Sequence, residues 1–335
     1  MKRILSLVLC LMMVLSLAAC GGKEKSKGHL VIYTSEPQDL VTEMLEDFSA
    51  KTGITYELFR SGTGDVKTKI SGEIEATGAT NANIVWFADL AYMYGLDEKG
   101  MLYHYTPDAA KDLPDAYKYN NGMGHEVRAI YTVLAYNTLN IDAANAPKDW
   151  ADVTKDTFKS KVALANPAYS GGAMTALSAH IENPDLVGWD WYNALAANDA
   201  KMETSNGTLS TKVASGEYNA VVIVDYLPRN AKTAGSPVDY VYPASGSCLI
   251  NTPLCIVNSE DETTIEAAKA FVNYMFEVET QKLFVAQGYV PMNSAAAEGS
   301  DVPTYDQIKV LPATVEFMQK NTSDMQAKFL DIFGE

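Results

Sequence analysis

The sequence predicts an α/β protein built from two lobes. Short apolar runs typical of buried strands alternate with segments whose apolar residues recur at helical spacing, as in 30–33 followed by 41–50. This alternation is typical of mostly parallel sheets covered by helices. Beyond a short leader, the 335-residue chain has room for two lobes of ordinary size, and it carries two loops of small residues at 61–64 and 170–173.

The first half alternates regularly between expected strands and helices. The expected strands are 30–33, 54–59 and 83–87, and the expected helices are 41–50 and 65–77. The apolar residues of 41–50 share one helical face, and Gly53 ends that helix. Ligands bind where the strands of such sheets end, so we expect one edge to carry these residues: Thr34, Ser35, Gly62, Thr63, Ala88 and Asp89.

After a polar, aromatic segment at 92–124, the pattern repeats. We expect strands at 129–136, 162–165, 220–224, 238–242 and 249–257. We expect helices at 172–181, 189–197, 208–215, 264–277, 278–287 and 311–333. The lobes are expected to hinge where the chain crosses between them, near 133–137 and 243–251.

Two small-residue loops each follow an expected strand and open an expected helix. Residues 60–65 read Arg-Ser-Gly-Thr-Gly-Asp, and residues 166–173 read Asn-Pro-Ala-Tyr-Ser-Gly-Gly-Ala. Such a loop often only caps its helix. The first backbone N–H groups of a helix are nevertheless free donors at the positive end of its dipole, and glycines let a ligand approach them. Two such loops in a bilobed chain suggest that they face each other and grip one small polar or anionic ligand.

The N-terminus reads as an export signal. Basic residues at 2–3 precede an apolar run at 4–17, which is short for a membrane span. The run ends in Leu-Ala-Ala-Cys at 17–20, which resembles the bacterial lipobox, in which the cysteine receives a diacylglyceryl group. We therefore expect a signal peptide at 1–19 and a flexible, lipid-anchored tether at 20–28 beginning at Cys20. The alternative is an ordinary signal peptide with a chance cysteine.

Composition excludes several classes of protein. The chain is 47% hydrophobic and 20% charged, which indicates packed cores. Its formal net charge of −16 argues against a nucleic-acid partner. Cys248 and Cys255 lie in apolar runs on either side of Pro253. They could form a disulfide outside the cytoplasm or be two buried thiols.

No pattern of a catalytic site is present. The four histidines, His29, His104, His125 and His180, stand apart, without metal-ligand spacing. The sequence has no Gly-x-Ser-x-Gly elbow and no Walker-type phosphate loop. We therefore expect no enzyme activity, no cofactor and no resident metal.

Several short motifs, in order, resemble one family. They are Val31-Ile32-Tyr33-Thr34-Ser35, Ser61-Gly62-Thr63-Gly64, Tyr136-Asn137-Thr138, Asn166-Pro167, Val224-Asp225-Tyr226 and Gly288-Tyr289-Val290-Pro291. Over 30–293 the chain resembles the extracellular solute-binding proteins (family 1) of ATP-driven (ABC) importers, in the ferric-ion, 2-aminoethylphosphonate and sugar-phosphate branch. The resemblance implies a type II periplasmic-binding-protein fold with two crossover strands. It implies lobe 1 at 29–135 plus 250–335 and lobe 2 at 136–249.

The resemblance also implies ligand residues on both lobes. From lobe 1 they are Ser35, Gly62, Thr63 and Gly64, and from lobe 2 they are Ser170, Gly171, Asn206, Asp225 and Tyr226. Tyr226 could instead be a packed aromatic, and Asp225 could either bind a ligand amine or cap the following turn.

Departures from the ferric binders point to a different ligand. Those proteins typically use two adjacent tyrosines, whereas this chain has Tyr226 followed by Leu227. Pro37 occupies the usual histidine position, and Ala88 replaces the expected carboxylate, for which Asp89 could substitute. We therefore expect a phosphonate or organophosphate, with ferric ion, held by Tyr226, as the alternative.

The resemblance implies capture of a small anionic solute and delivery to a membrane permease and its ATPase. We expect a monomer outside the cytoplasm, anchored by lipid to the cell membrane of a Gram-positive host. A structural or adhesive surface lipoprotein is the alternative from another class.

Overall fold

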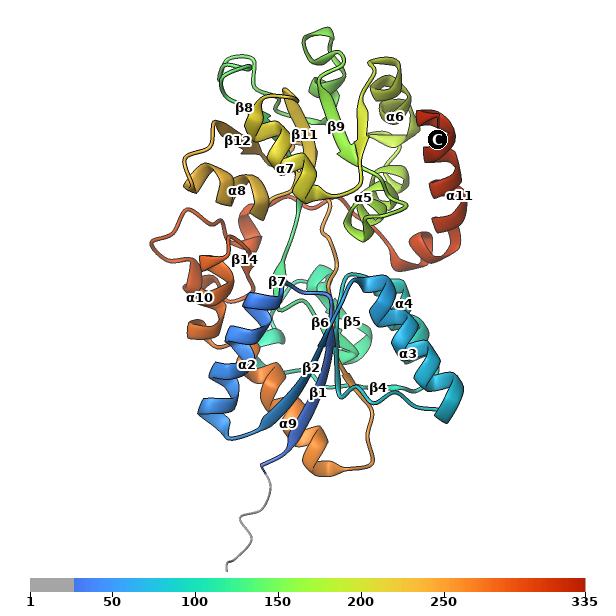
Figure 1. Cartoon of the computed structure of the whole chain (residues 1–335), viewed down its shortest axis with the longest axis vertical. Coiled ribbons are helices and arrows are strands. Elements are labelled where there is room, and N and C mark those ends of the chain that lie inside the picture. Colours follow the sequence, from blue (N-terminus) through green and yellow to red (C-terminus); the bar gives the residue numbers. More distant parts are fainter. Residues whose placement is uncertain (1–26, 335) are drawn as a thin grey trace, which may run out of the picture.

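The computed structural model describes residues 27–334 and consists of two lobes stacked along the long axis of the molecule (Figure 1). The expected signal peptide, Cys20 and most of the tether lie outside the described residues. Among the residues that are described, no helix is both long and apolar enough to cross a membrane.

Lobe 1 is organised by a seven-stranded mixed sheet with the order β2-β1-β3-β13-β6-β5, with β4 paired to β13. The first three strands of the chain pair in parallel, and β13 returns antiparallel to β3. The strands are β1 (His29–Thr34), β2 (Thr55–Arg60), β3 (Ile84–Trp86), β4 (Leu102–Tyr103), β5 (Lys118–Tyr119), β6 (Gly124–His125) and β13 (Leu254–Val257).

Lobe 2 has a five-stranded mixed sheet with the order β10-β9-β11-β8-β12. Strand β9 pairs in parallel with β10 and β11, and β8 runs antiparallel to both of its neighbours. The strands are β8 (Thr132–Asn137), β9 (Val162–Ala165), β10 (Lys201–Glu203), β11 (Ala220–Val224) and β12 (Val238–Val241). The parallel pairing expected from the sequence thus holds for β1 with β2 and β3, and for β9 with β10 and β11. Strands β8 and β13, which lie next to the lobe crossings, run antiparallel to their neighbours.

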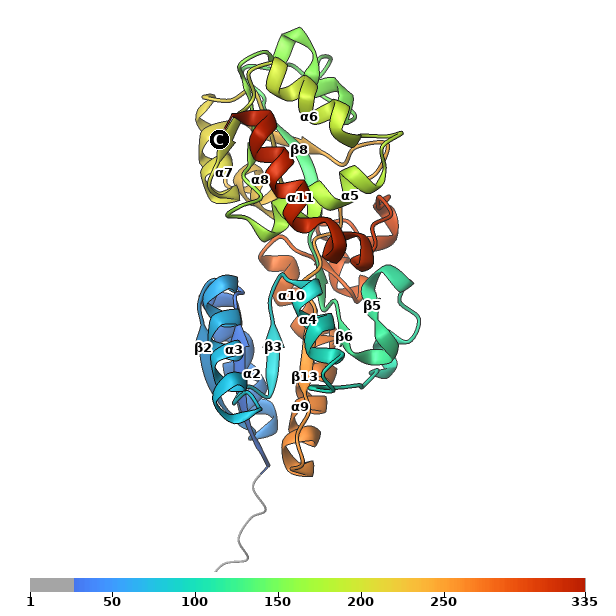
Figure 2. The ribbon, with the colours of Figure 1, turned by 90° about the vertical axis from the view of Figure 1, so that its right-hand side faces the viewer.

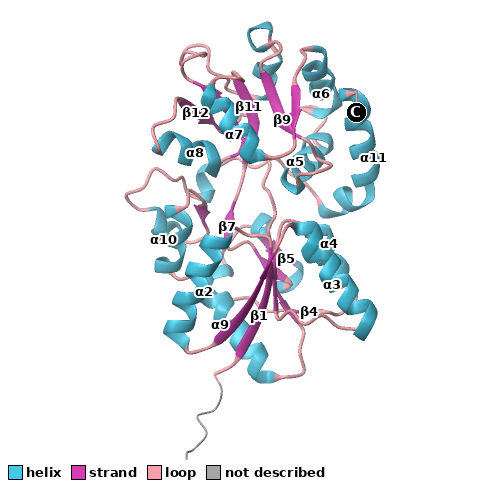
Figure 3. Cartoon of the chain, viewed as in Figure 1, coloured by secondary structure: helices cyan, strands magenta, loops and turns pink. Residues whose placement is uncertain are grey.

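Helices cover the sheets of both lobes (Figure 3). Lobe 1 carries α2 (Gln38–Thr52), α3 (Thr63–Thr77), α4 (Leu90–Asp97), α9 (Glu262–Met275) and α10 (Val278–Ala286). Lobe 2 carries α5 (Gly171–Glu182), α6 (Gly188–Ala197), α7 (Asn206–Ser215) and α8 (Tyr226–Thr233), and the chain ends in α11 (Val315–Phe333). The short 3-10 helices are η1 (Asp108–Ala110), η2 (Asp115–Tyr117), η3 (Asn120–Gly122), η4 (Trp150–Thr154), η5 (Asp156–Phe158), η6 (Ser294–Ala297) and η7 (Tyr305–Gln307).

The apolar face predicted for the first helix is the face that α2 buries. Leu40, Val41, Met44, Leu45 and Phe48 are buried, and Gly53 ends the helix in the left-handed conformation with φ +75°. Only glycine adopts this conformation at little cost. Hydrophobic periodicity therefore located this helix, and the glycine marked its end.

The chain crosses between the lobes along two adjacent segments. Ile250 N donates to Ile130 O at 2.9 Å, and Thr132 N donates to Cys248 O at 2.9 Å. The predicted first crossing at 133–137 is wrong, because those residues form β8, which is buried in the lobe 2 sheet. The first crossing lies instead just before β8, after β7 (Arg128–Ala129), which pairs with β14 (Val290–Pro291).

A third passage takes the C-terminus to lobe 2. Ser247 N donates to Lys309 O at 2.8 Å, and Leu311 N donates to Ser247 O at 2.9 Å. Helix α11 then packs on α5 and α6 (Figure 2), with the Phe329 ring 5.5 Å from the Tyr192 ring. The predicted lobe boundaries need correction, since β8 and α11 belong to lobe 2. The apolar face of α11 did not reveal which lobe would cover it.

A buried carboxyl group ties the two crossing segments together in lobe 1. Glu126 accepts hydrogen bonds from Thr252 N at 2.7 Å, from Thr252 Oγ1 at 3.1 Å and from the Tyr119 hydroxyl at 2.5 Å. Asn251 Nδ2 donates to the same tyrosine hydroxyl at 2.6 Å. Burial raises the pKa of Glu126 to about 7.

Cys248 and Cys255 are both buried free thiols, so the disulfide left open by the sequence does not form. Burial raises the pKa of both thiols. They are core residues and are not reactive groups.

Candidate functional site

Several helices begin where a strand ends at the junction of the lobes. Helix α3 begins after β2, α5 after β9, α7 after β10 and α8 after β11. The sheets of both lobes reach toward this junction (Figure 3). Free N–H groups and positive dipole ends are therefore brought together from both lobes, which is a favourable environment for an anion.

On lobe 1, the predicted residues Ser35 and Thr63 lie side by side. Thr63 Oγ1 donates to Ser35 Oγ at 3.1 Å, and Ser35 N donates to Trp86 O at 3.3 Å, which fixes the end of β1 against β3. There is open space around Gly62 and Gly64. A Cβ atom added at Gly62 would have only Asp65 Oδ2 within 4 Å, at 3.9 Å, and a Cβ atom added at Gly64 would have no neighbour within 4 Å. The α3 start is therefore accessible to a ligand.

On lobe 2, Ser170 and Asn206 are joined to each other. Ser170 caps α5 by accepting from Ala173 N at 3.2 Å, and it also accepts from Asn206 Nδ2 at 3.4 Å. Asn206 Oδ1 in turn accepts from Val224 N at 3.3 Å. Both bonds at Ser170 use its oxygen as an acceptor, so its hydroxyl hydrogen can be donated to a ligand.

The lobes approach each other at Gly171. A Cβ atom at this position would lie 3.1 Å from the carbonyl oxygen of Ala88, at the end of β3 in lobe 1. Such a separation is tighter than ordinary van der Waals contact, so only glycine fits without movement. Gly171 is therefore a predicted ligand residue that the structure places directly against the opposite lobe.

A cavity of about 360 Å³ lies beside this contact. A volume of this size suits a small solute. Lys67, Ala88, Asp89 and Tyr92 line it from lobe 1, and Gly171, Met174, Thr175 and Gln319 line it from α5 and α11. Of the predicted ligand residues, Gly171 alone lines this cavity.

Asp89 already has partners. Lys67 Nζ lies 2.5 Å from Asp89 Oδ2, and Asp89 Oδ1 accepts from Tyr92 N at 2.9 Å as the cap of α4. Its carboxylate therefore neutralises a lysine and caps a helix, which weakens the idea that it replaces the missing metal-binding carboxylate.

Asp225 also has its oxygens occupied. It is 0% exposed and accepts from Tyr131 N at 3.1 Å, from the Tyr242 hydroxyl at 2.8 Å and from Arg229 Nη2 at 3.0 Å. These donors anchor α8 to the first crossing segment. The geometry assigns Asp225 to holding this helix through these bonds, and its side chain does not cap α8.

A buried cluster that sequence reasoning missed surrounds Tyr226. The Arg128 guanidinium is 2% exposed and forms an ion pair with Glu36, the residue after Ser35. It also lies 4.2 Å from the centroid of the Tyr289 ring, and that ring lies 4.5 Å from the Tyr226 ring. Burial raises the pKa of both tyrosines.

The cluster joins the two lobes, because Tyr226 starts α8 in lobe 2 and the other members belong to lobe 1. Tyr289 belongs to one of the family-like motifs, but the sequence predicts no role for it. A charged residue within the apolar stretch 127–136 was the signal that could have drawn attention to Arg128.

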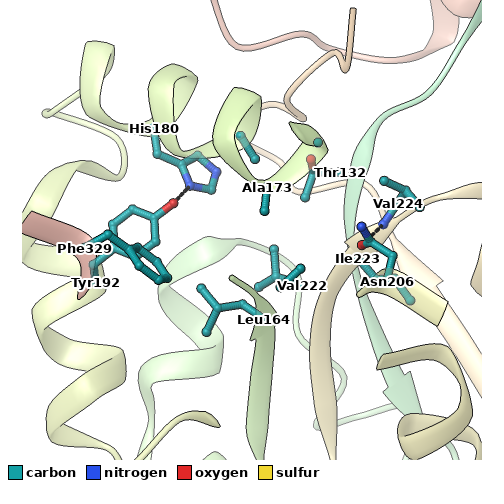
Figure 4. A pocket seen from close by; sticks show the side chains of 13 residues that line it. Thr132, Leu164, Ala173, His180, Tyr192, Asn206, Val222, Ile223, Val224 and Phe329 are labelled. Carbon is teal, nitrogen blue, oxygen red and sulfur yellow. Dashed lines mark hydrogen bonds between the residues drawn. The ribbon is translucent and has the colours of Figure 1, made fainter. Parts of the chain in front are cut away.

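A second cavity lies behind the lobe 2 loops (Figure 4). It has a volume of only about 30 Å³, and Ala173, Asn206, His180 and Tyr192 are among its lining residues. His180 Nδ1 bonds the Tyr192 hydroxyl at 2.8 Å, and burial lowers the pKa of His180 to about 3. This neutral, nearly filled space has room for a water molecule but not for an organic solute.

Within the part of the chain that is described, no group of three or more histidine, cysteine, aspartate or glutamate side chains is placed to hold a metal ion. A phenolate-based site would use tyrosines, and the neighbouring rings of Tyr226 and Tyr289 are the feature relevant to one.

Comparison with known proteins gives a consistent family. A model of the bacterial extracellular solute-binding proteins matches residues 43–310. A probable ABC transporter periplasmic-binding protein of Sinorhizobium fredii is 26% identical over 274 residues, covering 78% of this chain and 74% of that protein.

Solved structures show the same fold at low identity. Periplasmic binding protein AfuA from Actinobacillus pleuropneumoniae, with fructose 6-phosphate bound, has a TM-score of 0.74 at 21% identity, covering 92% of this chain and 99% of that one. Iron-bound HitA from Pseudomonas aeruginosa has a TM-score of 0.73 at 21% identity, covering 91% and 99%. The expected type II periplasmic-binding fold with two lobes is confirmed.

Proposed function

This chain belongs to the bacterial extracellular solute-binding proteins, and from that membership we propose that it captures a phosphonate or organophosphate between its lobes. It is the substrate-binding protein of an ABC importer, and its family acts in transport. After capture, the two lobes together present the solute to the permease, whose ATPase partner drives import.

The observation that supports the proposal is that each lobe carries a hydroxyl-bearing residue at the start of a helix that follows a strand. Thr63 opens α3 beside Gly62, and Ser170 precedes α5 beside Gly171. A phosphonate or phosphate head has several oxygens, so it can accept from the Ser170 hydroxyl, from the Thr63 hydroxyl in place of Ser35 Oγ, and from the backbone N–H groups next to them. Because the net charge of the chain is −16, its long-range electrostatic field does not attract an anion. These local donors must therefore supply the affinity.

Truncation of either hydroxyl should weaken binding about tenfold or more, because a charge-assisted hydrogen bond contributes roughly 1.5–3 kcal/mol. We would titrate Thr63→Ala and Ser170→Ala by calorimetry with 2-aminoethylphosphonate, fructose 6-phosphate and inorganic phosphate. Thr68→Ala is the matched control, since Thr68 lies exposed on α3 and donates only to its own helix at Gly64 O. Wild-type affinity of both variants for a solute that binds would refute the site, and no binding in the panel would refute the solute class.

The Tyr226–Tyr289 pair supports ferric ion as a second candidate. It supplies two neighbouring phenols, although Tyr289 and not residue 227 provides the second. Against it, burial raises the pKa of both, which disfavours the phenolate form that binds iron. Ferric ion is therefore included in the panel, and a visible absorption band that disappears in Tyr226→Phe would identify the protein as an iron binder.

We propose lipid anchoring at Cys20 because of the lipobox-like sequence before it. Membrane-extracted protein should have a mature N-terminus at Cys20 that carries the mass of a diacylglyceryl group, and Cys20→Ser should lack it. Mass spectrometry of the N-terminal peptide measures this directly. An unmodified N-terminus on cleaved wild-type protein would show that the sequence is an ordinary signal peptide.

A further inference from the structure

A contact between the lobes lies beside the Tyr226–Tyr289 pair. It joins α8 of lobe 2 to residues 287–289, which follow α10 in lobe 1. Arg229 Nη1 donates to Gly288 O, and Asn230 Nδ2 donates to Gln287 O at 2.9 Å. Successive side chains of one helix thus bond successive carbonyl groups of the opposite lobe.

The guanidinium of Arg229 is held rigidly on its own lobe. It is 5% exposed, its Nη2 lies 3.0 Å from Asp225 Oδ2, and its Nε donates to the Tyr240 hydroxyl at 3.0 Å. Nη2 also donates to the Tyr242 hydroxyl at 2.5 Å. With its other donors engaged in this way, the arginine presents Nη1 to lobe 1 in a fixed direction.

The accepting carbonyl groups are equally fixed on lobe 1. Tyr289 N donates to Phe284 O at 2.9 Å, which ends α10, and Val290 then pairs with Ala129 in the β14–β7 ladder. Gln281 Nε2 donates to Val127 O at 2.7 Å and holds α10 to the first crossing segment. Both halves of the contact are therefore preformed, so joining them orders little additional structure.

We propose that Arg229 and Asn230 form a latch that favours the closed arrangement of the lobes. They are positioning residues: they hold Tyr226 against Tyr289, and neither lines the cavity of about 360 Å³ beside Gly171. The inference rests on the proposed capture of solute between the lobes. Apparent affinity falls with the fraction of protein in the binding-competent state, so a latch of this kind raises affinity by lowering the cost of closure.

Gly288 gives a test that needs no solute. Its φ is +81°, and an added Cβ atom would collide with Asn230 Oδ1 on the other lobe. In Gly288→Ala the Asn230 amide has to move away from the new Cβ atom, and we expect this movement to break its bond to Gln287. In an Asn230→Ala background that collision is absent, so the same alanine should cost only its backbone strain.

Thermal unfolding of the mature chain measures this coupling. We expect Gly288→Ala to lower the Tm more in the wild type than in Asn230→Ala, by about 2 °C or more, which is the effect of one ordinary interaction in a large domain. Gly235→Ala is the control for strain, because Gly235 has φ +83° and nothing within 4 Å of its Cβ position. Equal losses in the two backgrounds would overturn the latch.

Small-angle X-ray scattering then tests its effect on the lobes. Leucine at position 288 is too large for Asn230 to avoid by rotation, so Gly288→Leu should have a larger radius of gyration than both the wild type and Gly235→Leu. A Gly288→Leu protein as compact as these two would overturn the proposal. Neither measurement uses a solute, so failure of the solute panel and failure of the latch can be told apart.

Discussion

Gly171→Val should reduce solute affinity at least about a hundredfold, equivalent to about 2.8 kcal/mol. Its Cβ would lie 3.1 Å from the Ala88 carbonyl oxygen, and a backbone atom cannot swing aside as a side chain can. The lobes would have to stay apart, and the branched side chain would also cover the N–H groups at the start of α5.

Calorimetry with a solute that binds the wild-type protein measures this loss. Gly72→Val is the matched control, because Gly72 lies on α3 with nothing within 4 Å of its Cβ position. Both variants should fold, since neither substitution enters a core. Wild-type affinity in Gly171→Val would mean that the Gly171–Ala88 approach is not part of the bound state.

Arg128→Met should destabilise the protein by about 3–5 kcal/mol, the usual cost of removing one partner of a buried ion pair. Glu36 is 3% exposed and would lose its ion-pair partner, and the Tyr289 ring would lose the guanidinium packed 4.2 Å from its centroid. Urea unfolding, followed by circular dichroism, gives the change in the free energy of unfolding.

A double variant separates the contribution of the two charges to stability from the contribution of side-chain packing. Glu36→Leu combined with Arg128→Met removes both charges of this ion pair, so it should recover most of the stability lost in Arg128→Met. If the double variant is as unstable as the sum of the single variants, packing, and not the unpaired carboxylate, causes the loss.

Local patterns predicted most elements because their causes are local. The apolar face of α2 and the glycine that ends it are visible in 38–53. Helix α8 was missed because it has only eight residues, which include Pro228 and several polar side chains. Proline is tolerated in the first turn of a helix, so Pro228, the third residue of α8, does not break it.

The candidate site could be predicted only in part. The loops at 61–64 and 170–171 could be predicted because small residues precede a helix in each of them. By contrast, the Glu36–Arg128 ion pair joins positions 92 residues apart, and the Arg229–Gly288 bond joins positions 59 residues apart. Such pairings depend on how the lobes sit together, and nothing in the neighbouring sequence encodes that arrangement.

The return of α11 to lobe 2 places the two ends of the described chain on different lobes. The first strand, β1, lies in lobe 1, and the last helix packs on α5 and α6 of lobe 2 (Figure 1). A donor and an acceptor dye attached at these ends would change their energy transfer whenever the lobes move. Domain swings could thus be followed optically in single molecules, without any label inside the cleft.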